Sequence, residues 1–545
     1  MKYTVTTTLL ILVLMTSCKQ KVDILVYNAQ VYTVNENFDN ASAFAVQDGR
    51  ILAIGNDEEI LGSFSSDQMI DAKGKAVYPG FNDGHSHFLG YGLSAYNVDL
   101  NGTNSFEEVI KRVADHHQKY PTEWITGRGW DQNDWVVKEF PTKEQLDGAF
   151  PNNPVVLRRV DGHALIANSE AMNRAGITNE SFLSGGEIIM QNGEPTGIFI
   201  DNAMGLITRA IPKPSKDQMI RALKKAQEDC FSVGLTTVSD AGLSKEAILL
   251  IDSLHKSGDL DMRIYAMMNP SEENFKYFFS REPIFTGKLT VSSVKLYIDG
   301  ALGSRGALLI EPYSDDPENF GLQLNPEQYY NDICNRAYNA GYQVNTHAIG
   351  DSGNRIMLNT YARFLKGTND RRWRVEHAQI VHPDDFGIFK KYSIIPSVQS
   401  THCTSDMYWA DERLGEQRIK TAYAYKALLS QNGWLVNGTD FPVEGINPLH
   451  TFYAAVARKD LKGWPESGFQ VENALNREEA LRSITLWPAK GSFEEDFKGS
   501  LEIGKVADFV ILDQDIMQID EDHIPTTKVL STYVGGNNKY RLEKQ

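Results

Sequence analysis

Two histidines separated by a single residue, His85 and His87, follow a short apolar run and a Pro-Gly pair. On a β-strand, residues two positions apart point to the same face, so both imidazoles can aim at one point. Neutral imidazole is a common metal ligand near neutral pH. The pair indicates either half of a metal site or two ordinary polar histidines at a strand end.

Four further residues of metal-binding type lie in, or directly after, apolar strand-like runs. They are Lys295, His347, His377 and Asp440. Each has an ordinary alternative: a strand lysine can pair with a carboxylate, a lone histidine is often only polar, and an aspartate after Gly-Thr can cap the next element. The ordinary explanation would have to hold for all six residues, each time at a strand end. One shared site is therefore favoured.

The runs that carry these residues alternate with helical stretches, which is typical of βα units and a parallel sheet. Eight strands are expected: the run before His85, and residues 236–239, 262–266, 294–298, 342–346, 373–376, 394–398 and 434–437. Eight βα units predict an α/β fold of the (β/α)8 TIM-barrel type over residues 79–490. In such a barrel, catalytic residues gather at the C-terminal ends of the strands.

The chain is longer than a barrel requires, and two additions are predicted. A long insertion of about residues 90–225 follows the first barrel strand and contains a hairpin signal at Asn192-Gly193. Residues 18–78, with a second hairpin signal at Asp48-Gly49, and residues 491–545 each contain too few strands to bury a core alone. We expect the two ends to pair as one small β-sandwich that flanks the barrel.

The N-terminal segment has the pattern of a targeting signal. Lys2 precedes an apolar run over 9–15 that is too short to span a bilayer. The ending Met-Thr-Ser-Cys resembles a bacterial lipoprotein cleavage site. This resemblance implies that residues 1–17 are removed and that a lipid on Cys18 anchors the protein to a membrane of the cell envelope, on the periplasmic side or at the surface. A plain secretory signal is the alternative.

Composition excludes several classes of partner and site. The chain has 41% hydrophobic and 23% charged residues, as is ordinary for a soluble globular protein. Its formal charge is −17 and it has no basic block, so nucleic acid is not an expected partner. Cys230, Cys334 and Cys403 are far apart and lack a Cys-x-x-Cys pair, which argues against a disulfide framework and a zinc–thiolate site. A homo-oligomer is left open.

The order His-x-His, strand lysine, His, His and Asp on a predicted barrel resembles the amidohydrolase superfamily. The strings over 79–87, 295–305, 345–351 and 437–442 resemble its amidohydrolase-3 branch, which includes N-substituted formamide deformylases. The long insertion after the first strand fits that branch. The resemblance covers essentially the whole chain after the signal segment.

This resemblance implies a divalent-metal site, with zinc as the expected metal and one or two ions per chain. His85, His87 and Asp440 would bind one ion and His347 and His377 a second, while Lys295 would bridge both as a carbamate formed with CO2. Metal-activated hydroxide would attack a polarised carbonyl. Asp440 would take the proton as general base and return it to the leaving nitrogen as general acid.

Loop residues are candidates for contact with substrate. His163, in an Asp-Gly-His string, resembles a branch histidine that faces the site and would hold substrate or the oxyanion, unless it is structural. Trp130 and Asp131 lie in a polar-aromatic string over 127–133 and would wall the pocket, although an insertion tryptophan is as often core. Arg305 would bind a substrate carboxylate or pair with Asp299. His402 is a weaker candidate at the mouth.

The sequence therefore predicts a metal-dependent hydrolase that cleaves a non-peptide amide C–N bond of a small molecule, an N-substituted formamide or related amide. One alternative is hydrolysis of a lactone, carbamate or other ester at the same site. Another is a non-catalytic binding lipoprotein on a retained fold. The complete set of six ligand candidates argues against the binding protein.

Overall fold

The computed structural model describes residues 19–543, so the predicted signal segment and Cys18 lie outside the described residues. Eight parallel strands form one sheet in the order β10-β17-β18-β20-β21-β22-β23-β24, and β19 pairs with β20. Backbone hydrogen bonds link the first strand to the chain after the last, from Asp440 N to His85 O (2.8 Å) and from His87 N to Phe441 O (2.9 Å). The sheet is a nearly closed barrel, which confirms the predicted TIM-barrel-like α/β fold.

All eight predicted runs overlap a barrel strand. The strands are β10 (Phe81–Ser86), β17 (Leu235–Leu243), β18 (Arg263–Met268), β19 (Ile284–Phe285), β20 (Leu289–Tyr297), β21 (Gln343–Ala348), β22 (Arg374–His377), β23 (Ile395–Val398) and β24 (Val436–Asn437). They are buried almost throughout, because helices cover the outer face of the sheet and side chains fill its interior.

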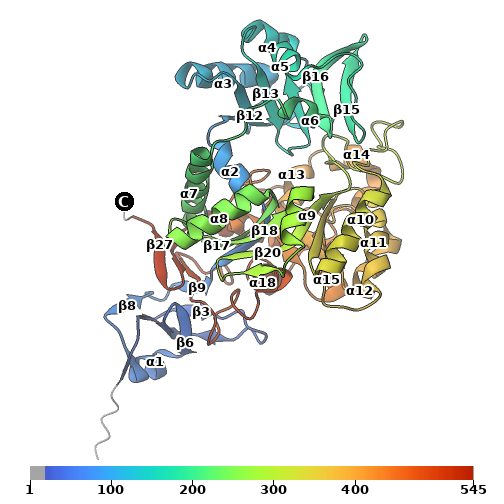
Figure 1. Ribbon diagram of the computed structural model, residues 1–545. Coiled ribbons are helices and arrows are strands. Elements are labelled where there is room, and N and C mark those ends of the chain that lie inside the picture. The colour runs from blue at the N-terminus through green and yellow to red at the C-terminus, as the bar shows by residue number, and fades with distance from the viewer. Residues whose placement is uncertain (1–18, 544–545) are drawn as a thin grey trace, which may run out of the picture.

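Helices surround the barrel, as Figure 1 shows. They include α7 (Lys216–Ser232), α8 (Lys245–Ser257), α9 (Glu272–Phe278), α10 (Glu327–Ala340), α11 (Asp351–Leu365), α12 (Phe386–Lys391), α13 (Ser400–Asp406), α14 (Ala410–Arg418), α15 (Tyr425–Asn432), α16 (Pro448–Ala457), α17 (Arg477–Ser483) and α18 (Leu486–Gly491). Local signals set their ends: α7 begins at a capping box of Ser215 and Gln218, and α8 ends at Gly258 with φ 76°. The short helix α2 (Phe88–Ser94) follows the first strand directly.

The insertion between β10 and β17 forms a six-stranded sheet of its own, in the order β11-β12-β13-β14-β16-β15. Its elements are β11 (Val98–Asp99), α3 (Phe106–Lys119), β12 (Ile125–Trp130), α4 (Glu144–Ala149), β13 (Val155–Arg159), β14 (Ala164–Ala167), α5 (Ser169–Ala175), β15 (Gly186–Gln191), β16 (Glu194–Asp201) and α6 (Met204–Thr208). Asn192 (φ 52°) and Gly193 (φ 84°) form the two-residue turn between β15 and β16, so the predicted hairpin is confirmed. The insertion lies at one end of the barrel (Figure 1).

Strands from the two ends of the chain meet in a second six-stranded sheet, in the order β27-β26-β25-β9-β3-β4. A four-stranded sheet, β6-β5-β2-β8, shares a core with it, in which the rings of Phe44 and Phe509 meet edge to face at 5.1 Å. The strands are β2 (Ile24–Tyr27), β3 (Gln30–Tyr32), β4 (Asn40–Ala41), β5 (Ala43–Gln47), β6 (Arg50–Gly55), β8 (Gln68–Asp71), β9 (Ala76–Pro79), β25 (Phe509–Leu512), β26 (Val529–Val534) and β27 (Asn537–Arg541). The short pair β1 (Gln20–Lys21) and β7 (Phe64–Ser65) and helix α1 (Asp57–Ser63) lie beside them.

Two further expectations concern the described residues. Cys230, Cys334 and Cys403 are all buried free thiols, in agreement with the absence of a disulfide pattern. None of the helices over residues 19–543 is long and apolar enough to cross a membrane.

Candidate active site

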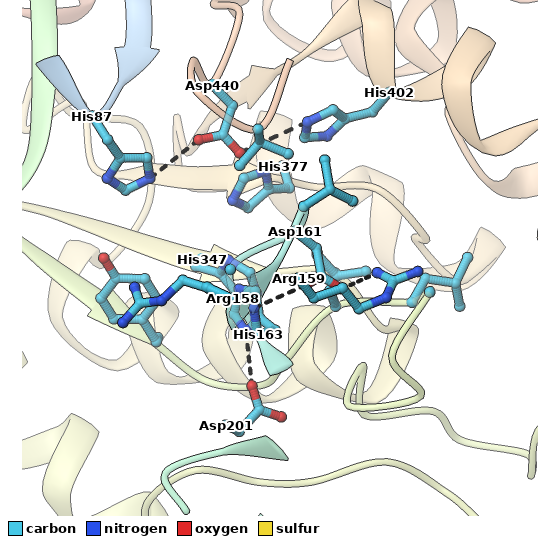
Figure 2. A pocket seen from close by; sticks show the side chains of 18 of the residues that line it. His87, Arg158, Arg159, Asp161, His163, Asp201, His347, His377, His402 and Asp440 are labelled. Atoms are coloured by element: carbon cyan, nitrogen blue, oxygen red, sulfur yellow. Dashed lines mark hydrogen bonds and ion pairs between the residues drawn. The ribbon is translucent and has the colours of Figure 1, made fainter. Parts of the chain in front are cut away.

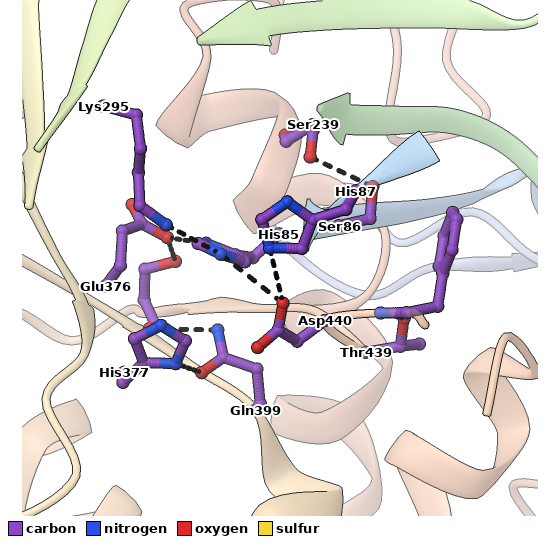
Figure 3. A network of polar contacts seen from close by, with 12 residues as sticks. His85, Ser86, His87, Ser239, Lys295, Glu376, His377, Gln399, Thr439 and Asp440 are labelled. Carbon is purple, nitrogen blue, oxygen red and sulfur yellow. Dashed lines mark hydrogen bonds and ion pairs between the residues drawn. The ribbon is translucent and has the colours of Figure 1, made fainter. Parts of the chain in front are cut away.

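The C-terminal ends of the barrel strands bring the predicted ligands together, as Figure 3 shows for most of them. His85 lies near the end of β10, Lys295 on β20, and His347 and His377 near the ends of β21 and β22; all four are buried. The ring of His377 lies 5.0 Å from the ring of His85 and 4.5 Å from that of His347, measured between centroids. Residues from distant parts of the chain thus share one site.

Asp440, just after β24, lies among these histidines. Its Oδ1 is 3.2 Å from Nε2 of His87 and 3.8 Å from Nε2 of His85, and its Oδ2 is 3.7 Å from Nε2 of His402. The potential ligand atoms of His85, His377 and Asp440 all lie within 4.8 Å of one another. Asp440 (φ 61°) and His377 (φ 72°) both have left-handed backbone conformations, which cost about 1–3 kcal/mol each and are typical of functional sites.

Hydrogen bonds orient the rings of two of these histidines, His85 and His377. Nδ1 of His85 bonds to Glu376, and Nδ1 of His377 lies 2.6 Å from Oε1 of Gln399. Both acceptors favour the tautomer with hydrogen on Nδ1 and a free lone pair on Nε2. The two Nε2 atoms are therefore available as ligands.

Glu376 was not singled out by the sequence analysis, although it holds His85 in place. Its carboxylate accepts hydrogen bonds from Nε of Arg374 (2.7 Å) and from Oγ of Ser397 (2.7 Å). Burial opposes its ionisation, but the charge of Arg374, together with the hydrogen bond from His85 and the charge of Lys295, outweighs this effect and holds the pKa of Glu376 well below its usual range. Two charged residues inside the buried strand Arg-Val-Glu-His were the signal that could have identified it.

The electrostatics favour neutral histidines beside an ionised carboxylate. Burial, together with the charge of Lys295, lowers the pKa of His85 to about 4. Burial raises the pKa of Asp440, but the interactions with His87, His85 and His377 together outweigh it and hold that pKa well below its usual range. Nζ of Lys295 lies 3.0 Å from Nε2 of His85, and burial lowers the pKa of Lys295 to about 8.

This donor set fits a divalent metal ion. Neutral imidazole nitrogens and a carboxylate oxygen are the ligands that such ions take in hydrolytic sites. Nε2 of His402, which also faces Asp440, is buried and has no hydrogen-bond partner within residues 19–543. A metal-ligand site explains why polar atoms converge here without pairing fully with one another.

A cavity of about 690 Å³ opens above these residues, with walls from both the barrel and the insertion (Figure 2). The barrel contributes His87, Lys295, His347, His377, His402 and Asp440, and the insertion contributes Arg128, Asp131, Arg158, Asp161, His163 and Asp201. The insertion therefore covers the C-terminal end of the barrel and forms part of the pocket.

His163 lies over the ligand cluster, as its motif led us to expect. Its ring centroid is 4.8 Å from that of His347, and its Nδ1 is 2.7 Å from Oδ1 of Asp201 (Figure 2). Burial lowers the pKa of His163, but the hydrogen bond and charge of Asp201 outweigh that effect and raise it. Asp201, at the end of β16, carries no local sequence signal that would have identified it.

Of the remaining substrate-binding candidates, one lines the cavity and two do not. Asp131 lines the cavity and pairs with Arg159. Trp130 is fully buried in the core of the insertion, where its Nε1 donates to the carbonyl of Leu157 (2.9 Å). Of the two possibilities for this tryptophan, pocket wall or core, the structure has the core. Arg305 is not among the described residues that line the cavity, and its guanidinium pairs with Asp315 (2.8 Å).

Known proteins resemble the chain over nearly its whole length. The sequence profile of the Amidohydrolase family matches residues 68–540, a range that contains the barrel, the insertion and all six ligand candidates. Protein LONG AFTER FAR-RED 3 of Arabidopsis thaliana is 34% identical over 539 residues, covering 95% of this chain and 91% of that protein. N-substituted formamide deformylase of Arthrobacter pascens is 26% identical over 551 residues, covering 95% and 98%.

A solved structure agrees with these matches. The crystal structure of an uncharacterized metal-dependent hydrolase from Pyrococcus horikoshii superposes with a TM-score of 0.75 at 29% sequence identity. The superposition covers 92% of this chain and 99% of that one. The likeness therefore includes the insertion as well as the barrel.

Proposed function

Because this chain belongs to the amidohydrolase family and is a metal-dependent hydrolase of carbon–nitrogen bonds other than peptide bonds, we propose that it cleaves a small N-substituted formamide or a related amide. The observation that carries the proposal is the convergence of His85, His377 and Asp440 at the base of a cavity that His163 faces from the insertion. The full-length similarity to a formamide deformylase supports the choice of amide.

The residues of the chain would share the chemical work. A bound divalent ion would polarise the amide carbonyl and lower the pKa of a water molecule. Asp440 is the ionised group placed to accept a proton from that water and to return it to the leaving nitrogen. His163, held by Asp201, would donate a hydrogen bond to the oxygen on which negative charge develops.

Lys295 is proposed to bridge two zinc ions as a carbamate formed with CO2, with His85, His87 and Asp440 on one ion and His347 and His377 on the other. Zinc suits nitrogen and carboxylate donors. The lowered pKa of Lys295, about 8, supports the carbamate because it leaves a larger share of neutral amine to react with CO2. Nuclear magnetic resonance of protein loaded with ¹³C-bicarbonate tests this, and the absence of a carbamate carbon signal would contradict it.

The direct test of function replaces Asp440. We expect Asp440→Asn to lower kcat for a formamide substrate by at least about a hundredfold, since a positioned general base contributes roughly 10²–10⁴-fold. The measurement combines a formate-release assay on a panel of N-substituted formamides with metal content by elemental mass spectrometry. The control is Asp252→Asn, which changes a carboxylate that pairs with Lys256 on the surface of α8.

The outcomes separate the alternatives. Formate release by the wild type that is lost in Asp440→Asn, with circular dichroism unchanged, supports an amide hydrolase. If the metal-loaded wild type hydrolyses lactones or carbamates but releases no formate, the proposed substrate is wrong and the proposed metal centre stands. Wild-type rates in Asp440→Asn would show that Asp440 is not the general base.

Two proposals concern the chain outside the centre. The shared core of the terminal sheets supports one flanking β-sandwich of residues 18–78 and 491–545 beside the barrel; an experimental structure without that shared core would contradict it.

The Met-Thr-Ser-Cys string supports a lipid anchor on Cys18 in a bacterial envelope. Metabolic labelling with palmitate tests the anchor, and equal labelling of Cys18→Ser would contradict it. Light scattering would measure whether the protein forms a homo-oligomer.

A further inference from the structure

Two arginines from the insertion, Arg128 and Arg158, line the catalytic cavity beside each other. They occupy paired positions on the parallel strands β12 and β13, so their side chains share one face of the insertion sheet. Burial, and after it the charge of Arg158, lowers the pKa of Arg128 to about 10. Two adjacent cations repel each other, and a sheet retains such a pair at a cost unless something compensates for it.

The donors of these two arginines are largely free. Arg128 donates one hydrogen bond, from its guanidinium to the carbonyl of Val160 (2.9 Å), and its Nε is buried without a partner within residues 19–543. Over the same residues, the side chain of Arg158 makes no hydrogen bond or ion pair and lies over no aromatic face, while its backbone pairs within the sheet. Both guanidinium groups are strong donors that remain charged at neutral pH.

Among the described residues, no carboxylate of the cavity forms an ion pair with Arg128 or Arg158, although the charges of Asp440 and Asp161 act on Arg128 through space. Arg159, the neighbour of Arg158, binds two of the cavity carboxylates, Asp131 and Asp161. The others with a bonded partner are Asp201 with His163, Asp406 with Tyr423, Glu444 with Ser405 and Asp440 with His87. Arg128 and Arg158 are therefore cations with donors left over, in the wall of a cavity whose base holds the metal ligands.

Arg128 is also held in place. The carbonyl of Val160 fixes one end of its guanidinium, and the backbone of Gly162 lies against it, so that a Cβ at Gly162 would approach the Arg128 guanidinium to 3.2 Å. Gly162 is the glycine of the Asp-Gly-His string that ends at His163. One loop therefore positions an arginine and the histidine that faces the ligand cluster. A preorganised guanidinium loses little entropy when it binds an anion.

We infer that Arg128 and Arg158 form a binding site for an acidic group of the substrate, so that the amide cleaved by this enzyme carries a carboxylate, as an N-formyl amino acid does. This inference rests on the proposed function. It adds that the substrate carries an anionic group close to the amide bond that is cleaved. Guanidinium groups match carboxylates in charge and geometry. The site would select acids over neutral amides of equal size.

A matched pair of substrates tests the inference on the metal-loaded full chain. N-formylphenylalanine and N-formylphenethylamine differ only in the carboxylate. We expect kcat/KM of the wild type to be at least about tenfold higher for the acid. Arg158→Gln should reduce kcat/KM for the acid by about tenfold to a hundredfold, the range for lost hydrogen bonds to a charged group, mainly through KM. The neutral amide should change less than about twofold.

Controls separate this role from a structural one. Arg158→Lys should recover part of the preference for the acid, because it restores a cation. Arg174→Gln removes an arginine from α5 of the insertion, where it pairs with Glu123 and Glu170, and should leave both substrates at wild-type values. An equal loss for both substrates in Arg158→Gln, or a wild type that does not distinguish them, would overturn the inference while the amide hydrolase stands.

Binding measured by calorimetry distinguishes failure of the inference from failure of the proposed function. If neither amide is hydrolysed but the wild type binds N-formylphenylalanine and Arg158→Gln does not, the anion site is supported and the proposed reaction is wrong. If the wild type binds neither ligand, the anion site is wrong as well.

Discussion

At the scale of single residues, His163 and Asp201 act as a coupled pair in the wall of the pocket. The carboxylate is buried and lies 2.7 Å from Nδ1 of the imidazole, while the imidazole ring lies tilted against that of His347, with 4.8 Å between the centroids. An imidazole alone in this position would lose its proton easily, because burial lowers its pKa. The neighbouring carboxylate reverses that direction, so His163 remains a cationic donor at higher pH than an ordinary histidine.

This coupling predicts a shift in the pH dependence of catalysis. In Asp201→Asn the largest raising interaction is lost, while burial and the smaller contributions of Asp161 and Asp299 remain, so the pKa of His163 should fall from its raised value. If protonated His163 stabilises the oxyanion, the alkaline limb of the profile of kcat/KM should move to lower pH. Steady-state rates between pH 5 and 9 provide the measurement.

The raised pKa of His163 also makes the free energy of unfolding depend on pH. A raised histidine pKa contributes stability below the unfolded pKa of about 6.5, and this contribution is lost as pH rises through the raised folded value. Asp201→Asn should therefore lose stability chiefly at acid pH. Asp229→Asn, which alters a carboxylate that pairs with Lys225 on α7, is the matched control. An alkaline limb that does not move in Asp201→Asn would show that His163 does not titrate in the catalytic range.

At the scale of elements, the insertion and the barrel fit together through the loop after β20. Asp201 ends β16 with a left-handed backbone (φ 50°), and its carboxylate lies against the backbone of Gly300 and Gly306 in that loop. Gly300 belongs to the string over 295–305, and Gly306 follows that string directly. The absence of side chains there lets a buried carboxylate from the insertion reach His163.

We predict that Gly300→Ala displaces this carboxylate. An added methyl group at Gly300 would overlap Oδ1 and Oδ2 of Asp201, which is part of a packed wall. Stability should fall by about 1–3 kcal/mol, and kcat should fall together with it because His163 loses its partner. Urea unfolding and formate release measure the two effects.

Gly387→Ala in α12 is the comparison, because a Cβ at that position meets nothing within 4 Å. Alanine in an open helical position should be neutral or stabilising by about 0.5–1 kcal/mol. A Gly300→Ala enzyme as active and as stable as Gly387→Ala would show that the loop does not hold Asp201 in place.

At the scale of the whole molecule, the features that the sequence predicted are those encoded locally. Each barrel strand is a short apolar run, and each ligand candidate lies at the end of such a run, so periodicity and residue type were enough. Partners that meet only in three dimensions were not predicted: Glu376 bonds to His85 across 291 residues, and Asp201 meets the loop after β20 through packing. Trp130 and Arg305 show the same limit, since both residue types suit a pocket but their neighbours in the fold bind them elsewhere.

The barrel and the sheet of the chain ends are joined by one buried ion pair, Arg263 and Asp508. Arg263 begins β18, at the opposite end of the barrel from the pocket, and its Nε and guanidinium NH2 donate to the carboxylate of Asp508 at 2.6 and 3.0 Å. The same carboxylate accepts from the backbone of Gly535 (2.7 Å), and the carbonyl of Asp508 accepts from Gly80 N (2.9 Å) just before β10. One residue therefore links the barrel, the C-terminal hairpin and the start of the first strand.

We predict that Asp508→Asn lowers the free energy of unfolding by about 3–5 kcal/mol, because it leaves the guanidinium of Arg263 buried without a counter-charge. The pocket lies at the other end of the barrel, so kcat/KM of the folded enzyme at low temperature should stay within about twofold of the wild type. Urea unfolding followed by fluorescence and by activity measures both. Asp370→Asn is the control, since that carboxylate is exposed where it pairs with Arg372 and should cost at most about 1 kcal/mol. Equal stability of the two variants would mean that solvent compensates Arg263, and that other contacts, such as that of Thr532 with the carbonyl of Phe231, join the terminal sheet to the barrel.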